Sequence, residues 1–175
     1  SLGDARMSLI ILTGASGSGK TAIAEAIARD ATRKLAVYHF DSIGVPSLDV
    51  MTRDHGSPEG WQRDKTVEWL MLLAPEAQKG RAMLFEGQMR PSFIAEAVAA
   101  AGIDDCRILL IDCDDATRTH RLCVERAQPE LADANMMNWA AYLRREARNS
   151  GYEILDTSRL TVEESVAGVL KHLDR

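Results

Sequence analysis

The sequence lacks the features of disulfide-rich secreted proteins and of membrane proteins. Its three cysteines, Cys106, Cys113 and Cys123, form no CxxC pair, and their odd number argues against a disulfide framework. We therefore expect free, buried thiols and a cytoplasmic protein. No apolar run approaches the roughly 18 residues that a membrane-spanning helix requires, so we expect no membrane partner.

Metal-binding and nucleic-acid-binding patterns are also missing. The four histidines are dispersed and lack metal-site spacing such as HExxH, so we expect no zinc site built from protein ligands. The net charge of −5 argues against broad binding to nucleic acid. We expect no nucleic-acid partner and either a monomer or a homodimer.

The length and composition suit a single globular domain. The chain has 175 residues, of which 46% are hydrophobic, and no repeat or low-complexity linker divides it. A chain of this size can bury a core without disulfides or structural metals. We expect the domain to cover residues 7–175, with Met7 as the natural start and residues 1–6 as an expression remnant or a disordered start.

Short apolar runs alternate with segments of helical periodicity. The runs predict five strands, at Met7–Thr13, Ala36–Asp41, Ala82–Glu86, Arg107–Asp112 and Tyr152–Asp156. Helical patterns separate and follow them, among them Pro91–Ala101, Ala116–Ala127, Trp139–Arg148 and Thr161–Leu173. This alternation predicts the α/β class, with a five-stranded parallel sheet and helices on both faces.

Three segments depart from this regular alternation. Gly44–Gly60 is rich in turn residues and predicts a long loop, and Trp61–Lys79 predicts a helix that breaks at Pro75. Gln128–Asn138 interrupts the helical pattern after the fourth strand. Polar residues end the first four strands, at Thr13, Asp41, Glu86 and Asp112. Because parallel sheets bind ligands beyond the carboxyl ends of their strands, we expect the functional site there.

The motif with the most specific chemistry follows the first strand. It matches G-x-x-x-x-G-K-[ST] with the residues Gly14, Ala15, Ser16, Gly17, Ser18, Gly19, Lys20 and Thr21. Glycines let the backbone curl so that its N–H groups surround an anion, and the next helix adds its positive end. We expect Lys20 to reach the β and γ phosphates of a nucleotide and the Thr21 hydroxyl to bind Mg²⁺.

Phosphate binding alone does not separate a kinase from a GTPase, an ATPase motor or a nucleotide sensor. A GTPase needs an N-K-x-D motif to read its base, and the fourth strand here runs into DCDD instead. Two alternatives to a small-molecule kinase stay open: a nucleoside-monophosphate kinase, and a non-kinase nucleotide-binding protein such as a GTPase-like switch.

With its phosphate loop and these strand ends, the sequence resembles the P-loop small-molecule kinases, which include shikimate kinase, gluconate kinase and chloramphenicol phosphotransferase. The resemblance rests also on Asp41 in HFDS, Glu86 in LFEGQ, Asp112 followed by Arg121-Leu122, and the segment Asp156-Thr157-Ser158. It implies a sheet order of 2-3-1-4-5, with a short lid at residues 128–138. It also implies ATP and Mg²⁺ as cofactors and a small hydroxylated acceptor.

The resemblance also implies roles for the polar residues at the strand ends. Asp41 would accept the proton of the acceptor hydroxyl, which suits phosphoryl transfer because that reaction needs a carboxylate to orient the nucleophile. Glu86 would hold Mg²⁺ or one of its waters, although Glu departs from the commoner Asp and puts direct metal contact in doubt. We interpret Asp112 as structural.

Arginines follow the fourth strand, and guanidinium groups suit phosphate because they stay charged and bind it bidentately. By resemblance, Arg121 and the pair Asp156 and Thr157 would lie near the adenine, and Arg126 would begin the lid and act in catalysis. On the acceptor side we expect Arg53 and Arg90, together with Asp41 and Glu86, which favours an anionic or polyhydroxylated acceptor. The sequence names no particular substrate.

Overall fold

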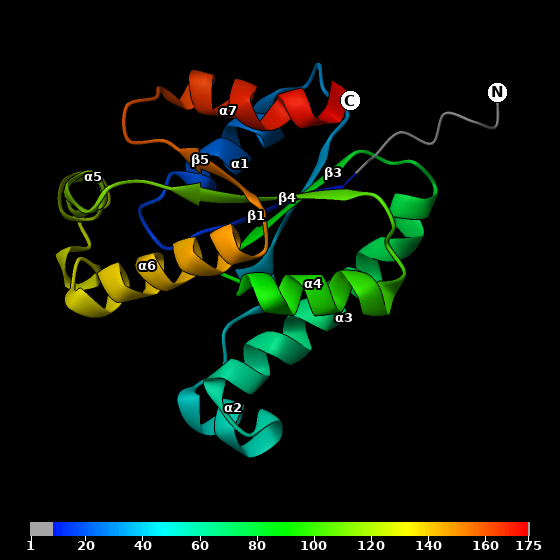
Figure 1. Cartoon of the computed structure of the whole chain (residues 1–175), viewed down its shortest axis with the longest axis horizontal. Coiled ribbons are helices and arrows are strands. Elements are labelled where there is room, and N and C mark those ends of the chain that lie inside the picture. The colour runs from blue at the N-terminus through cyan, green and yellow to red at the C-terminus, as the bar shows by residue number, and fades with distance from the viewer. Residues whose placement is uncertain (1–8, 175) are drawn as a thin grey trace.

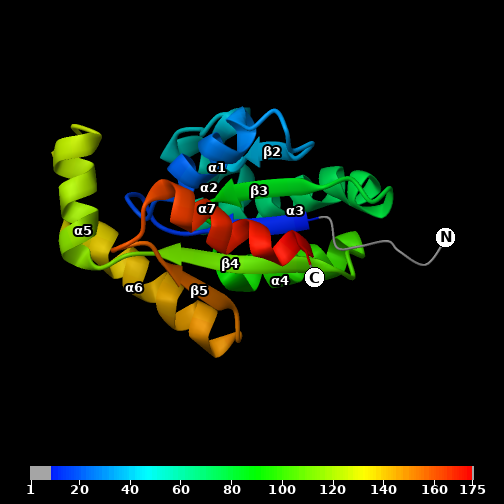
Figure 2. The ribbon, with the colours of Figure 1, turned by 90° about the horizontal axis from the view of Figure 1, so that it is seen from above.

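The computed structural model describes residues 9–174, so the expectations for Met7 and residues 1–6 lie outside the described residues. Its centre is one parallel sheet in the order β2-β3-β1-β4-β5, with helices on both faces (Figures 1 and 2). The strands are β1 (Leu9–Thr13), β2 (Ala36–His39), β3 (Met83–Gly87), β4 (Cys106–Asp112) and β5 (Glu153–Asp156). The predicted class, strand number and order are confirmed.

The central strands form the core because both of their faces are covered. Alternate residues of β1 point to opposite faces. Leu9 and Ile11 pack with Phe85 beneath α3 (Pro58–Gln78) and α4 (Pro91–Ala101). Ile10 and Leu12 pack on the other face, beneath α1 (Lys20–Arg29) and α7 (Val162–Leu170). A third cluster joins β4 to α6 (Ala134–Asn149).

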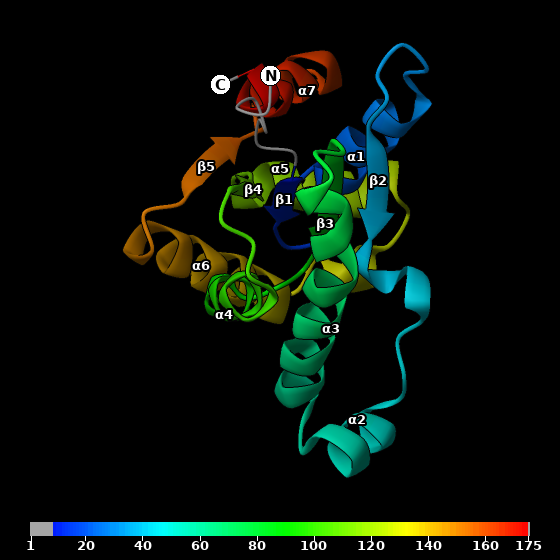
Figure 3. The same ribbon diagram turned by 90° about the vertical axis from the view of Figure 1, so that its right-hand side faces the viewer.

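The segment predicted as a long loop, Gly44–Gly60, contains a helix, and that prediction is wrong. Helix α2 (Leu48–His55) begins after Ser47, whose side chain accepts a hydrogen bond from the N–H of Val50, and it ends at Gly56 in the left-handed conformation. Such caps satisfy the free backbone groups of a short helix. Figure 3 shows α2 beyond α3, at the far side from the sheet.

The predicted break at Pro75 is also wrong, because α3 continues to Gln78. Pro75 lacks the N–H that would bond to the carbonyl of Met71. Met71 is exposed, so water can hydrogen-bond that carbonyl instead. The helix also begins earlier than predicted, at Pro58, with the Ser57 side chain accepting a hydrogen bond from Gly60.

The region after β4 is more regular than its sequence indicates. Helix α5 (Asp115–His120) leads into a π-helical turn, Arg121–Glu125, and a 3₁₀ turn follows at Pro129–Leu131. Helix α6 begins at Ala134 rather than at Trp139, because the Asp133 side chain caps it by accepting from the N–H of Met136. Much of the segment predicted to be irregular, 128–138, is therefore helical.

The ends of two other helices have residues that favour them. Helix α4 begins at Pro91 and is followed by Gly102 in the left-handed conformation. Helix α7 begins with a capping box between Thr161 and Glu164, with both hydrogen bonds formed. Among the described residues, no helix has both the length and the apolar character needed to cross a membrane.

We predict that Phe85→Ala lowers the free energy of unfolding by about 3–5 kcal/mol, as truncation of a buried aromatic usually does. Phe85 is fully buried and its ring centroid lies 5.1 Å from that of Trp69. Urea denaturation measures the change. Met71→Ala, at an exposed position of α3, is the control and should change stability by less than about 0.5 kcal/mol. Equal effects of the two substitutions would contradict this assignment of the core.

Candidate functional site

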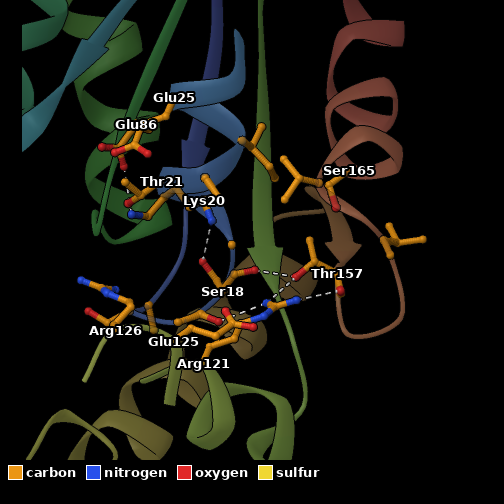
Figure 4. Close-up of a pocket in the computed structure, with 18 of the residues that line it drawn as sticks. Ser18, Lys20, Thr21, Glu25, Glu86, Arg121, Glu125, Arg126, Thr157 and Ser165 are labelled. Carbon is orange, nitrogen blue, oxygen red and sulfur yellow. Dashed lines mark hydrogen bonds and ion pairs between the residues drawn. The ribbon is translucent and has the colours of Figure 1, made fainter. Parts of the chain in front are cut away.

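A pocket of about 690 Å³ lies at the carboxyl ends of the strands, a volume typical of small-ligand sites. Seven of the motif residues line it, from Ala15 to Thr21. The other lining residues include Glu25, Asp41, Glu86, Gln88, Arg121, Glu125, Arg126, Thr157, Leu160, Thr161, Val162 and Ser165. Figure 4 shows side chains from separate parts of the chain around the loop.

The motif glycines are needed for the shape of the loop. Gly17 and Gly19 have φ angles of 80° and 99°, in the left-handed region that glycine tolerates best. Gly14 lies behind the loop rather than in the pocket lining, and a Cβ there would come within 2.3 Å of the backbone oxygen of Ile111. The glycines therefore allow both the curl of the loop and its close approach to β4.

Three successive carbonyls of the loop each accept a hydrogen bond from a side chain outside it. Arg118 Nη1 donates to Ser16 O (2.8 Å), Arg121 Nη1 donates to Gly17 O (3.1 Å), and the Thr157 hydroxyl donates to Ser18 O (2.5 Å). Arg121 also donates to the hydroxyl and the carbonyl of Thr157, which Figure 4 shows. These bonds fix the outer side of the loop, so its carbonyls do not compete with an anion for the loop N–H groups. Two of those N–H groups have partners within the loop, because Ser18 N–H donates to Ala15 O (3.2 Å) and Lys20 N–H donates to the Ser18 hydroxyl (3.4 Å).

Arg118 is fully buried behind the loop, together with the carboxylate of Asp112. Arg118 Nη2 lies 2.9 Å from Asp112 Oδ1, and Arg144 Nε of α6 lies 2.5 Å from Asp112 Oδ2. Buried charges are stable when they are paired and hydrogen-bonded in this way. The arrangement agrees with the structural interpretation of Asp112 and shows that Arg118 supports the loop from behind.

Lys20 and Glu86 form an ion pair on the other side of the loop. Lys20 Nζ lies 2.9 Å from Glu86 Oε2, and His39 Nδ1 lies 2.7 Å from Glu86 Oε1. Burial would raise the pKa of Glu86, but the Lys20 charge and the hydrogen bonds from His39 and Lys20 outweigh it and hold the pKa below the usual value. Glu86 is therefore ionised at neutral pH and accepts a hydrogen bond from His39 Nδ1.

Asp41 lies just after β2, in the 3₁₀ turn Phe40–Ile43, and lines the same pocket. Its pKa is raised above the usual value, first by burial and then by the negative charge of Glu86, against the opposing effects of Lys20 and His39. Two neighbouring carboxylates thus have pKa values shifted in opposite directions, a pattern common where one group handles a proton and the other stays charged.

The π-helical turn explains how Arg121 and Arg126 both line the pocket. The N–H of Arg126 donates to the carbonyl of Arg121 across five residues (2.9 Å). Residues five apart lie nearly above one another in a π turn, whereas in an α-helix they diverge. Ala127 follows with a φ of 50°, a left-handed conformation that is uncommon outside glycine. The backbone is unusual at the point where the predicted lid begins.

Several of the predicted site residues lie outside this pocket. Arg53 is on α2, where its Nε donates to Asp54 (2.9 Å), and Asp156 accepts hydrogen bonds from the N–H and the hydroxyl of Ser158. The Arg90 guanidinium lies 4.9 Å from the ring centroid of Trp139 and donates to Gln62 Oε1 (2.9 Å). The structure brings Asp41, Glu86, Arg121, Arg126 and Thr157 to the motif, but not Arg53, Arg90 or Asp156.

Sequence reasoning missed the role of His39 and the buried position of Arg118. His39 and Glu86 are direct partners in the register of β2 and β3. Aligning the predicted strand ends, Asp41 and Glu86, would have paired Asp41 with Glu86 instead, so no direct signal for His39 was present. No signal marks Arg118 either, since its burial depends on the path of the chain after β4.

The donor set fits Mg²⁺ bound with a nucleotide. Thr21 has a hydroxyl in the pocket lining, on the same side as Glu86 in Figure 4. Mg²⁺ prefers oxygen ligands and keeps several waters. Both Glu86 oxygens already accept from Lys20 and His39, so this carboxylate suits a metal-bound water better than direct coordination.

No family model matches this sequence, and a search of curated proteins finds no match either. Among solved structures, the chain is similar to a sugar kinase from Janibacter sp. HTCC2649, with 21% identity, coverage of 96% of this chain and 95% of the other, and a TM-score of 0.67. It is similar to a tunicamycin resistance protein from Deinococcus radiodurans, with 16% identity, 95% coverage of both chains and a TM-score of 0.65. It is also similar to a gluconokinase from Sinorhizobium meliloti 1021, with 18% identity, coverage of 97% of this chain and 93% of the other, and a TM-score of 0.62.

These likenesses confirm the predicted resemblance at the level of the fold. The chain has the five-stranded P-loop fold that small-molecule kinases share, and it spans nearly the full length of each of these proteins.

We predict that Arg118→Met lowers the free energy of unfolding by about 3 kcal/mol, because it leaves the buried Asp112 carboxylate with only one cationic partner. Urea denaturation measures this loss. Arg148→Met, at an exposed position of α6, makes the same chemical change and should have little effect. Stability equal to the wild type in Arg118→Met would contradict the proposed support of the loop.

Proposed function

We propose that the protein is an ATP-dependent kinase that transfers the γ-phosphoryl group to a hydroxyl of a small molecule. The observation that carries the proposal is the complete phosphate loop in one pocket with two carboxylates, Asp41 and Glu86. Phosphoryl transfer needs positioning, neutralisation of charge and one carboxylate to orient the nucleophile, and this site contains a group for each task.

On this proposal the loop N–H groups and Lys20 bind the β and γ phosphates. Lys20 is held in the pocket by its ion pair with Glu86, which a phosphate would displace. Thr21 and, through a water, Glu86 would hold Mg²⁺, which when bound supplies positive charge to the phosphates. Arg126 and Arg121 add cationic groups from the π-helical side of the pocket.

The adenine would bind on the side of the pocket formed after β5. Thr157 and Arg121 lie there, and Leu160 and Val162 add apolar surface to the lining. The acceptor would bind on the opposite side, near Asp41. Asp41 would orient the acceptor hydroxyl and receive its proton, a role that suits a carboxylate whose pKa is raised above the usual value.

The similar structures and the pocket lining together favour one class of acceptor. The similar structures include proteins described as a gluconokinase and a sugar kinase, whose named substrates are polyhydroxylated. Arg53 and Arg90 lie outside the pocket, so an anionic group on the acceptor would need contacts that this arrangement does not provide. A neutral or weakly charged polyhydroxylated acceptor therefore fits the site best.

A donor and acceptor screen tests the proposed activity. The purified protein is incubated with ATP or GTP and a library of sugars, sugar acids, hydroxylated antibiotics and nucleoside monophosphates, and mass spectrometry detects phosphorylated products. We expect a product with ATP and a polyhydroxylated acceptor, and its loss in a folded Lys20→Met variant because that variant lacks a phosphate contact. A nucleoside diphosphate as the sole product, or hydrolysis of GTP alone, would contradict the proposal.

We predict that Asp41→Asn leaves ATP affinity within a few-fold of the wild type but lowers transfer by about 10²–10⁴, the usual contribution of a general base. Asn keeps the size of the side chain and removes its charge and basicity. The base must be ionised, so the wild-type rate should fall as the pH falls through the raised pKa of Asp41. The residual rate of Asp41→Asn should lack this decline. Full activity in the variant, or an unchanged pH profile, would reject the assignment.

A further inference from the structure

The side chain of Gln88 connects the phosphate loop to helix α6. Gln88 Nε2 lies 3.0 Å from the Ser16 hydroxyl oxygen, and Gln88 Oε1 lies 3.0 Å from the indole Nε1 of Trp139. Ser16 and Gln88 both line the pocket. The side-chain amide of Gln88 therefore links Ser16, which lines the pocket, to Trp139 of α6, the first residue after the predicted lid.

The chemistry of the indole fixes the direction of both hydrogen bonds. An indole N–H only donates, so the group of Gln88 that faces Trp139 must be the carbonyl oxygen. The amide NH₂ of Gln88 must then face Ser16 and donate to its hydroxyl oxygen. Since Gln88 already donates to that oxygen, the Ser16 hydrogen must point elsewhere, and it remains available to donate to a ligand.

The rest of the Ser16 residue is also held in place. Arg118 donates to its carbonyl, so the peptide plane and the hydroxyl have separate partners. The backbone of Gln88 is fixed in turn, because its main-chain carbonyl accepts a hydrogen bond from Gln62 Nε2 (3.0 Å). Trp139 is stacked on Tyr142, with ring centroids 5.7 Å apart and planes within 10°. Little freedom is left for the amide to turn over.

The contact lies on the acceptor side of the loop. Gln88 directly follows β3, the strand that ends with Glu86 and pairs with β2, beyond which Asp41 lies. Thr157 and Ser165 lie on the opposite side, near the proposed adenine position (Figure 4). A donor placed on the acceptor side faces the terminal phosphate of a nucleotide rather than its base.

We propose that Gln88 and Trp139 are positioning residues that direct the Ser16 hydroxyl hydrogen towards the γ-phosphoryl group. This inference rests on the proposed nucleotide-dependent function, but it concerns recognition of the third phosphate and can be measured without turnover. Ser16 donates to the phosphoryl oxygen, Gln88 sets the direction of that donation, and Trp139 sets the orientation of Gln88.

The test compares the dissociation constants of ADP and of AMP-PNP, a non-hydrolysable ATP analogue, by calorimetry. Gln88→Glu has the same shape but accepts from both neighbours, so it draws the Ser16 hydrogen away from the pocket. We expect AMP-PNP to bind about 10- to 100-fold more weakly, as for the loss of a hydrogen bond to a charged group, while ADP binding changes much less. Gln88→Met, which adds no charge, should show a smaller loss with the same preference.

Two further variants establish that Ser16 transmits the effect. Trp139→Phe keeps an aromatic ring and removes the indole N–H together with the five-membered ring that carries it, so it should weaken AMP-PNP binding in the same direction as Gln88→Met. In a Ser16→Ala background, Gln88→Met should have almost no additional effect, because the group that it orients is absent. A full effect of Gln88→Met in that background would overturn the proposal.

Gln78→Glu, at the exposed end of α3, makes the matched change from amide to carboxylate away from the site and is expected to alter neither constant. Equal losses of ADP and AMP-PNP affinity in Gln88→Met and Trp139→Phe would indicate a merely structural role and overturn the proposal. Unchanged affinity for ADP and for AMP-PNP in these two variants would also overturn the proposal. If AMP-PNP discrimination follows the expected pattern but no acceptor is ever phosphorylated, the kinase assignment fails while the positioning role stands.

Discussion

An anion-binding loop must turn its N–H groups inward, and this requirement turns its carbonyls outward, where they need other partners. In this protein Arg118, Arg121 and Thr157 bond to the carbonyls of three consecutive loop residues. All three side chains come from the region between β4 and the loop after β5. The shape of the phosphate site therefore depends on chain more than ninety residues away from the motif.

This dependence explains the ion pairs behind the loop. Arg118 can remain fully buried because Asp112 neutralises it, and Asp112 in turn pairs with Arg144 of α6. Buried ion pairs are costly to desolvate and weak evidence of stability by themselves. Here the Arg118–Asp112 pair holds a donor rigidly against a loop carbonyl. We therefore attribute the buried pair to the shape of the site rather than to stability alone.

The parts of the molecule that follow from local pattern were predictable from the sequence. Continuous apolar runs such as Ile10–Leu12 predicted central parallel strands, and the motif from Gly14 to Thr21 predicted the loop between β1 and α1. The order of the strands came from resemblance to known kinases, because periodicity does not encode which strands are neighbours. Helix α2 was missed because its short length and flanking turn residues resemble a loop.

The side-chain partners were harder to predict, for a physical reason. Arg118, Arg121 and Arg126 look alike in the sequence, but one is buried behind the loop and the others line the pocket, because the helix widens into a π turn at Arg121. Arg90 was expected in the acceptor site and instead packs on Trp139. Such assignments depend on where the side chains meet after folding, and one sequence contains no direct signal for that.

The two sides of the loop are built from different kinds of interaction, and this difference fits the proposed reaction. On the side proposed for the adenine, the contacts are hydrogen bonds to backbone carbonyls, which need not change when a ligand binds. On the side proposed for the acceptor, an ion pair joins Lys20 to Glu86, His39 donates a hydrogen bond to Glu86, and Gln88 donates one to Ser16. On the proposed function, a phosphate would compete with Glu86 for Lys20, whereas His39 would keep the carboxylate in place. Binding of the donor would then free one oxygen of Glu86 beside the phosphates. A rigid side that holds the nucleotide would lie next to a side whose ion pair can rearrange during transfer.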